Sequence, residues 1–507
     1  MSKTPAYQRP SERPSKVRQA CDECHVRKIR CDGRKPCINC KGLEKACTYL
    51  AVHKKTGPRG PRCAQRLCGG PSIAAIRCSI PSPDKEIVSL AHSTLSSPSS
   101  KNGFLPSPQI NDAVVRWCLD AYFKHKYPLT PILHRKQLEQ TPVSAEQYGL
   151  IAACCAIIAL SPEILPPSAT LDNLTLPSSE FLISETLRSR EYCNLVEHPS
   201  LNHIRTSFFL YAAFFAMDKD NSAWYYLQEA ISMLQALRLH EEAAYNNSDD
   251  GVSASFARRM YWVLFITERA YALQRNRPIR LQDTLALPVV DPTSSDAEIL
   301  LGFLDLISLF RPFDADFITQ WNLATPSTAI DSAHLSSLQC LLKYALPNLA
   351  NYSQVQQADL LISRQWLKMV VWKLCASNRV LSTTNSQDVM SLHYPASIAR
   401  EIVLVSQLVP TQAFEANGIG ILEKVFDVGC SLADLLTLVP LGDHGSAMDI
   451  GVVDTLMEMV RIVGTRFGGT YRHLNILVEK ANECLLTNVD RSLPLPDDER
   501  CAIVEEI

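Results

Sequence analysis

The chain has 507 residues, of which 46% are hydrophobic and 20% are charged. A chain of this length is too long to fold around one compact core, and this composition excludes wholesale disorder. We therefore expect two or three domains. The formal net charge of −2 is unevenly distributed, because residues 1–62 hold 16 Lys and Arg against 5 Asp and Glu, whereas the remainder holds 34 against 47. A basic head on an acidic body indicates a polyanion-binding module joined to a second unit.

The N-terminal segment has no apolar run typical of a secretory signal, and the longest uninterrupted apolar stretch, residues 150–160, is too short for a membrane span. A transmembrane helix needs about 20 apolar residues. We therefore expect an intracellular protein with no membrane partner. In a reducing compartment its 18 cysteines are expected to be metal ligands, core thiols or reactive thiols rather than disulfides.

Six cysteines between residues 21 and 47 form a doubled pattern. The spacing Cys-x2-Cys-x6-Cys occurs twice, as Cys21, Cys24 and Cys31 and again as Cys37, Cys40 and Cys47. A Cys-x2-Cys pair can bring two thiolates onto one zinc ion at about 2.3 Å. Since a continuous helix would separate Cys24 from Cys31 by about 10 Å, the first helix must end near Lys28 and Ile29 and the chain must turn back.

The number of thiolates determines how two metal ions would share them. Two tetrahedral zinc ions need eight ligand positions, so two of the six cysteines must bridge both ions. The pseudo-symmetric choice is the first cysteine of each unit, Cys21 and Cys37. A disulfide framework would need an oxidising compartment, and a single zinc site would not explain the doubled unit. A finger of two cysteines and two histidines would need a histidine pair, and His25 and His53 are too far apart.

The cysteine-rich region resembles the fungal Zn2Cys6 binuclear cluster transcription factors. The resemblance lies in residues 20–32 (ACDECHVRKIRCD), 35–40 (KPCINC) and 47–49 (CTY). The resemblance implies a nuclear DNA-binding domain over residues 18–50 with two Zn2+ as cofactors. It further implies that the first helix enters the major groove of double-stranded DNA and recognises a CGG half-site.

The resemblance assigns the guanine contacts to Lys28, supported by Arg27 and Arg30. The physical chemistry agrees, because a cationic side chain can donate to guanine O6 and N7 in the major groove. Phosphate contacts rather than base contacts are expected for the other cations around the cluster and for Arg30 itself. This group comprises Arg18, Arg30, Lys41 and Lys45.

A basic stretch rich in proline and glycine follows at residues 54–62 and adds the DNA-binding candidates Lys54, Lys55, Arg59 and Arg62. Such a stretch can lie in an A·T-rich minor groove, act as a nuclear localisation signal or form a solvated linker, and the sequence leaves these alternatives open. The stretch resembles the post-cluster segment of maltose- and starch-regulon activators. This favours carbohydrate utilisation genes, with a secondary-metabolite biosynthetic cluster as an equal alternative.

Residues 63–108 contain 10 Ser, 6 Pro and 3 Gly, a composition that favours a flexible spacer. We therefore expect a disordered basic tail over 1–17 and a linker over 51–108. The apolar residues near Ile87 are too few for a coiled coil, which needs three or four heptads. The protein should then bind as a monomer or form a homodimer through its body.

From residue 109 onward the apolar residues follow a helical period, and strand alternation is scarce. We expect Asp112 to cap a first helix, and buried or amphipathic helices at 147–160, 203–215, 223–239 and 260–274. In the later part of the chain, Pro312, Pro347, Pro395 and Pro440 are expected to mark breaks between helices. The expected fold is a small zinc cluster module and a large all-α regulatory domain, joined by a flexible linker.

Five segments of the body resemble the fungal-specific transcription factor domain, which we place over 109–292. They are residues 122–123 (YF), 131–135 (PILHR), 239–241 (LHE), 258–262 (RRMYW) and 276–278 (NRP). Asn276 replaces the glycine of a Gly-Arg-Pro motif, and asparagine also tolerates the left-handed region. Residues 293–507 should continue as helices and end in an acidic tail, either an activation segment or a frayed terminus.

A helix-rich body can hold a small-molecule inducer between its helices. Polar residues beside aromatic ones are the candidates for such a site, with satisfied buried groups or salt bridges as the alternative. They are Arg135, Trp224, His240 and Arg269. The adjacent Cys154 and Cys155 are expected to pack in the core.

Catalytic motifs are missing from the sequence. The segment 418–420 (GIG) lacks the third glycine of a nucleotide loop, and 240–244 (HEEAA) lacks the second histidine of a zinc protease. The chain is therefore predicted not to be an enzyme but a sequence-specific transcription factor of RNA polymerase II genes. The alternative is a zinc-dependent protein-interaction scaffold without base preference.

Overall fold

The computed structural model describes residues 20–43, 45–49, 103–138, 144–161, 164, 175–246, 250–323, 332–346, 348–378, 381, 391–438, 451–465 and 471–492. The chain divides into two units, Met1–Ser97 and Pro98–Ile507, and each is described by itself. Several predictions lie outside the described residues, namely those for Arg18, Lys54, Lys55, Arg59, Arg62, Pro347, Pro440 and the acidic C-terminal tail.

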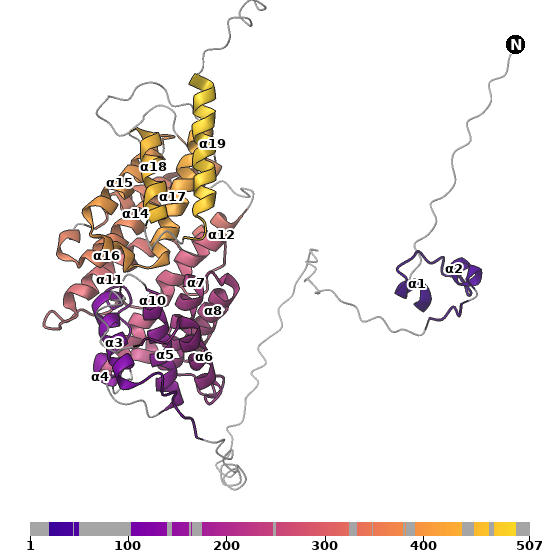
Figure 1. Ribbon diagram of the computed structural model, residues 1–507, viewed down its shortest axis with the longest axis horizontal. Coiled ribbons are helices and arrows are strands. Elements are labelled where there is room, and N and C mark those ends of the chain that lie inside the picture. Colours follow the sequence, from indigo (N-terminus) through magenta and orange to yellow (C-terminus); the bar gives the residue numbers. More distant parts are fainter. Residues whose placement is uncertain are drawn as a thin grey trace, which may run out of the picture. The chain divides into compact units, whose positions relative to one another are not determined.

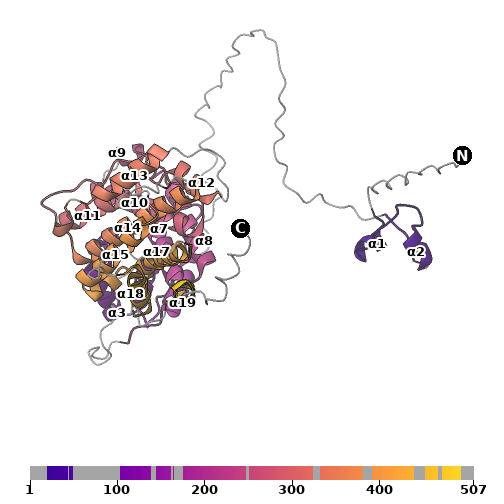
Figure 2. The same cartoon turned by 90° about the horizontal axis from the view of Figure 1, so that it is seen from above.

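The N-terminal unit contains two short helices, α1 (Asp22–Val26) and α2 (Ile38–Gly42), which are labelled in Figures 1 and 2. The first helix ends at Val26 and Lys28 has a left-handed φ of 55°, so the predicted end near Lys28 is confirmed. The peptide bond before Pro36 is cis.

The C-terminal unit is built from helices, as predicted. The structure gives them as α3 (Asp112–Ala121), the π-helix η1 (Tyr122–Lys126), α4 (Arg135–Leu138), α5 (Ala145–Ala159), α6 (Ser179–Arg190), α7 (Leu201–Ala216), α8 (Asp220–Ala236), α9 (Ala243–Asn246), α10 (Gly251–Arg275), α11 (Ala297–Phe310), α12 (Ala315–Asn322), α13 (Ser332–Tyr344), the short η2 (Leu349–Asn351), α14 (Gln354–Ser377), α15 (Tyr394–Leu408), α16 (Thr411–Glu415), α17 (Ile419–Leu438), α18 (Val452–Thr465) and α19 (Leu474–Ser492).

These helices form two packed groups. In Figure 1, α3 and α5 to α8 gather at one end of the unit, and α14, α15, α17, α18 and α19 gather at the other. Helix α10 packs against α7, α8 and α11, and α11 packs against α14, so this pair joins the groups. One hydrophobic core with members from Ile110 to Cys484 runs through both.

The expected helices are present, with two corrections at their ends. The side chain of Asn111, rather than that of Asp112, caps α3 and accepts from the nitrogens of Ala113 and Val114 at 3.0 Å. Asp112 is the first helical residue, where a carboxylate suits the helix dipole. Pro395 lies in the first turn of α15 and not at a break, because that turn needs no donor from it.

Three further features bear on the sequence predictions. Cys154 and Cys155 are both buried in the core, which confirms their packing role. Packing begins within the expected linker, since the ring of Phe104 lies 5.0 Å from that of Tyr148. Among the described residues, no helix is both long and apolar enough to cross a membrane.

Candidate metal centre and DNA interface

The six clustered cysteines converge on one small core. Their sulfurs form two groups of four, and within each group the ligand atoms lie within 4.8 Å of one another. One group is Cys21, Cys24, Cys31 and Cys37, and the other is Cys21, Cys37, Cys40 and Cys47. All six are free thiols, so the disulfide framework is not the structure of this cluster. Cys21 and Cys37 belong to both groups.

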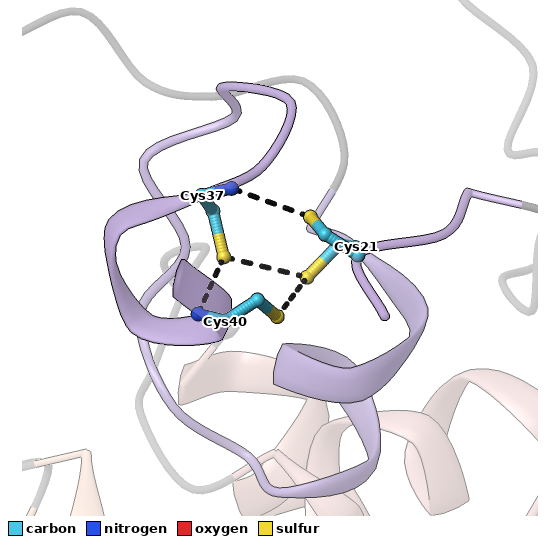
Figure 3. Close-up of side chains that lie close together, drawn as sticks. Cys21, Cys37 and Cys40 are labelled. Carbon is cyan, nitrogen blue, oxygen red and sulfur yellow. Dashed lines mark hydrogen bonds between the residues drawn. The ribbon is translucent and has the colours of Figure 1, made fainter. Parts of the chain in front are cut away.

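The distances between the sulfurs suit a shared metal. Cys21 Sγ lies 3.7 Å from Cys37 Sγ and 3.6 Å from Cys40 Sγ, and Cys24 Sγ lies 3.6 Å from Cys37 Sγ. Figure 3 shows the sulfurs of Cys21, Cys37 and Cys40 turned toward one another. The edge of a tetrahedral zinc–thiolate site is about 3.8 Å long, given the Zn–S distance. Two overlapping groups of four thiolates therefore fit two zinc ions.

The two shared cysteines occupy equivalent places in the two helices. Cys21 is the N-cap residue of α1 and Cys37 the N-cap residue of α2, where the sulfur of Cys37 accepts from the nitrogen of Cys40 at 3.4 Å. This backbone donor lowers the pKa of Cys37 to about 6, whereas burial raises the pKa of Cys24 to about 12. Helix starts thus favour the thiolate form at Cys37, the form that binds metals.

The cluster is closed by contacts between its two ends. The hydroxyl of Thr48 donates to Asp22 Oδ2 at 2.8 Å, and the nitrogen of Asp22 donates to the carbonyl of Thr48 at 2.8 Å. Lys45 pairs with Glu23 at 3.1 Å. This ion pair places Lys45 beside α1, with its side chain still 58% exposed.

The cations predicted to contact DNA surround the end of α1. Arg27, Lys28 and Arg30 are all exposed, and they follow directly after α1. Lys41 is exposed in the last turn of α2. The structure thus gathers three of the predicted cations on the segment where the chain turns away from the cluster.

The body residues proposed as ligand contacts are engaged within the protein. Arg135 pairs with Asp120 at 2.7 Å. Arg269 is 1% exposed and donates to the carbonyl of Leu281 at 3.2 Å.

The other two are engaged as well. The ring of Trp224 stacks on Tyr271 at 5.4 Å. His240 lies 3.6 Å from Glu241, and its carbonyl accepts from Thr284 at 3.0 Å. These contacts support a structural role for Arg135, Trp224 and Arg269, whereas His240 Nδ1 and Arg269 Nε are buried without a hydrogen-bond partner among the described residues.

Comparison with known families matches both units. Residues 19–56 match the model of the fungal Zn(2)-Cys(6) binuclear cluster domain, and residues 119–301 match that of the fungal specific transcription factor domain. The chain therefore contains a fungal Zn2Cys6 cluster domain, a domain that binds two zinc ions and DNA, followed by a helical fungal specific transcription factor domain.

Curated relatives span most of the chain. The probable sucrose utilization protein of Candida albicans is 26% identical over 82% of this chain and 79% of its own length. The maltose fermentation regulatory protein MAL13 of Saccharomyces cerevisiae is 25% identical over 83% and 84%. The respiratory transcription factor ZNF1 of the same yeast is 23% identical over 83% and 85%. This similarity extends well beyond the cluster into the helical body.

Proposed function

We propose that this protein acts in the nucleus as a regulator of sugar-utilisation genes and recognises CGG half-sites through its zinc cluster. The observation that carries the DNA-binding part is the pair of overlapping cysteine groups with exposed cations at the end of α1. The relatives named for sucrose and maltose support sugar genes over a biosynthetic cluster.

Within the cluster, we assign the bridging positions to Cys21 and Cys37. Their membership in both groups of four supports this assignment, as do their equivalent places at the starts of α1 and α2. Zinc at such a site supplies folding energy and takes no part in a reaction. Its protein ligands hold α1 and α2 at a fixed angle, so that the cations keep their spacing when they meet DNA.

For the DNA contacts, we assign base recognition to Lys28, supported by Arg27, and phosphate contacts to Arg30 and Lys41. An ammonium at the groove floor can donate to guanine O6 and N7, whereas flanking cations neutralise phosphates without reading sequence. The basic stretch at residues 54–62 adds phosphate or minor-groove contacts. Neutralising several phosphates makes the affinity fall steeply with salt.

The domain plan follows the same proposal. The cluster occupies 18–50, the regulatory domain 109–292, and a helical continuation 293–507. Regulation by an inducer and homodimerisation through the body complete the proposal, and the role is regulatory rather than catalytic.

Selection of duplexes from a randomised DNA pool by full-length, zinc-loaded protein tests this function. Enrichment of a single CGG triplet would support base recognition by a monomer. Enrichment of paired CGG triplets at a fixed spacing would support it with a dimer formed through the body. Recovery of bound duplexes with no common sequence would contradict it and favour the protein-interaction scaffold.

The sugar-gene part needs its own test. Transcripts are compared between cells with and without the gene, each grown on glucose, maltose and sucrose. Loss of induction of disaccharide transporter and hydrolase genes supports the proposal. A response confined to a contiguous biosynthetic cluster contradicts it and leaves the DNA-binding function standing.

A further inference from the structure

The helical body contains a cavity of about 410 Å³, within the range of small-molecule sites. Its walls come from segments far apart in the sequence: η1, α5, α7, α10, α11 and the turn from α16 into α17. It therefore lies where the two helix groups of the body meet. Arg135, Trp224, His240 and Arg269, which the structure describes, are not among its lining residues.

Aromatic and aliphatic side chains dominate the lining. Helix α7 supplies four rings and α11 supplies two, and aliphatic residues of α5, α10 and α17 fill the gaps between them. These six rings are those of Phe208, Phe209, Tyr211, Phe215, Phe303 and Phe310, and Tyr122 of η1 adds a seventh. Apolar surfaces of this kind bind a ligand by removing its apolar area from water.

Two hydroxyl groups of the lining, those of Tyr122 and Ser161, already bond to the protein. The hydroxyl of Tyr122 donates to the carbonyl of Thr130 at 2.5 Å, and that of Ser161 donates to the carbonyl of Ile157 at 3.0 Å. A ligand hydroxyl beside them would have to compete for these partners. A buried hydroxyl without a partner weakens binding, because it loses its hydrogen bonds to water.

The charged groups of the lining are engaged in the same way. Lys424 Nζ lies 3.1 Å from Asp359 Oδ1 and donates to the hydroxyl of Ser363 at 2.6 Å. Lys126 Nζ donates to the carbonyl of Ala416 at 2.9 Å. Because aromatic and aliphatic side chains make up most of the lining, it offers few partners for the many hydroxyls of a disaccharide and suits an apolar ring system better.

The turn between α16 and α17 keeps the cavity open. Gly418 has φ of 71°, and both Gly418 and Gly420 line the cavity. A Cβ atom built on Gly420 would meet no heavy atom within 4 Å, so the space beside this glycine is real and not filled by side chains. The same segment was noted in the sequence only as an incomplete nucleotide loop.

We propose that this cavity is a binding site for a mostly apolar, ring-containing organic molecule, and that it does not bind a disaccharide. Such a ligand would contact both helix groups at once and stabilise their packing by binding the folded body. This inference rests on the cavity alone and is independent of the DNA-binding function.

The test uses full-length, zinc-loaded protein titrated with N-phenylnaphthylamine, a neutral aromatic molecule that fluoresces in apolar surroundings. We expect saturable binding with one site per chain and no displacement by maltose or sucrose. Gly420→Leu fills the cavity and should weaken binding by at least about tenfold. The matched control is Gly251→Leu, at another helical glycine with no heavy atom within 4 Å and outside the lining, and it should bind as the wild type does.

A second filling variant, Ala270→Leu on the wall formed by α10, guards against a local folding defect in α17. Circular dichroism confirms that each variant keeps its helices. Equal weakening by both filling variants supports the site. Unchanged binding in a folded filling variant, absence of saturable binding by the wild type, or displacement by either sugar would overturn the proposal.

Discussion

The carbonyl oxygen of Cys24 accepts a hydrogen bond from the nitrogen of Ile29 at 3.1 Å, and Lys28, the residue just before Ile29, has φ of 55°. This bond ends α1 and turns the chain back toward Cys31. A glycine usually occupies the left-handed position at a helix end, because a side chain there costs about 1–2 kcal/mol. The presence of lysine at this left-handed position, despite the conformational cost, agrees with a contact made by its side chain that glycine could not make.

Replacing Lys28 separates these two roles. Lys28→Gly relieves the backbone and should keep the cluster folded, yet it should reduce discrimination for CGG by about 1–3 kcal/mol. Lys28→Ala should lose the same discrimination without the backbone relief. Competition between CGG and scrambled duplexes measures the discrimination, and thermal unfolding measures the relief. An equal fall in specific and non-specific affinity would make Lys28 a phosphate contact.

The bridging assignment predicts unequal effects of cysteine substitutions. Cys21 belongs to both groups of four, whereas Cys31 belongs to one. Full-length Cys31→Ser should therefore retain about one zinc per chain, and Cys21→Ser should retain less and unfold the cluster.

Atomic absorption of the purified proteins gives the zinc content, with the exposed Cys340→Ser as the control that keeps the wild-type value. Two zinc ions in a folded Cys21→Ser protein would rule out the bridging role of this residue.

The cysteine cluster could be predicted because its ligands lie close together in sequence. The spacing alone places the helix end near Lys28, and the two overlapping groups follow from the ligand count. The cap of α3 was missed, since Asn111 and Asp112 are both good capping residues and only the backbone conformation distinguishes them.

The cavity could not be predicted, because helices from η1 to α17 meet there and no local pattern records their packing. Polar residues beside aromatic ones do not mark the cavity, since Arg269 is buried and donates to the carbonyl of Leu281 instead. The useful signal was the pair of glycines at 418 and 420, where small residues leave space rather than contact a phosphate.

The C-terminal end of α10 tests the prediction that Asn276 adopts the left-handed conformation in place of a glycine. Asn276 has φ of 51° and ψ of 53°, so the expected left-handed conformation is confirmed. Asn276→Gly should leave the stability of the body unchanged or slightly higher, and Asn276→Ala should lower it by about 1 kcal/mol. Thermal unfolding of the full-length protein measures both.

Asn378 provides the contrast. It ends α14 with φ of −93°, where glycine has no conformational advantage. Asn378→Gly should therefore destabilise the protein, since it also removes the hydrogen bond from the amide to the carbonyl of Leu374. The same small effect from both glycine substitutions would show that the backbone conformation at residue 276 is not what selects asparagine.

Glu185 predicts a pH dependence of stability. Its carboxylate accepts from Arg188 at 2.8 and 2.7 Å and from the hydroxyl of Tyr148 at 2.6 Å. These donors, the guanidinium of Arg188 first, lower the pKa of Glu185 below its usual value. A lowered pKa in the folded state adds stability that is present above the unfolded pKa and is lost as the pH falls through the folded one. Glu185→Gln should thus cost about 1–2 kcal/mol at neutral pH, and the difference from wild type should shrink below about pH 4.5.

Urea unfolding of both proteins between neutral and acidic pH measures this difference. Glu191→Gln, at an exposed residue that follows the same helix, is the matched control and should show no pH-dependent difference. If the ionised Glu185 stabilises the body through its pair with Arg188, the difference in unfolding free energy between wild type and Glu185→Gln must disappear on acidification. A gap that stays constant down to acidic pH would mean that Glu185 stabilises the body by shape and neutral hydrogen bonds alone.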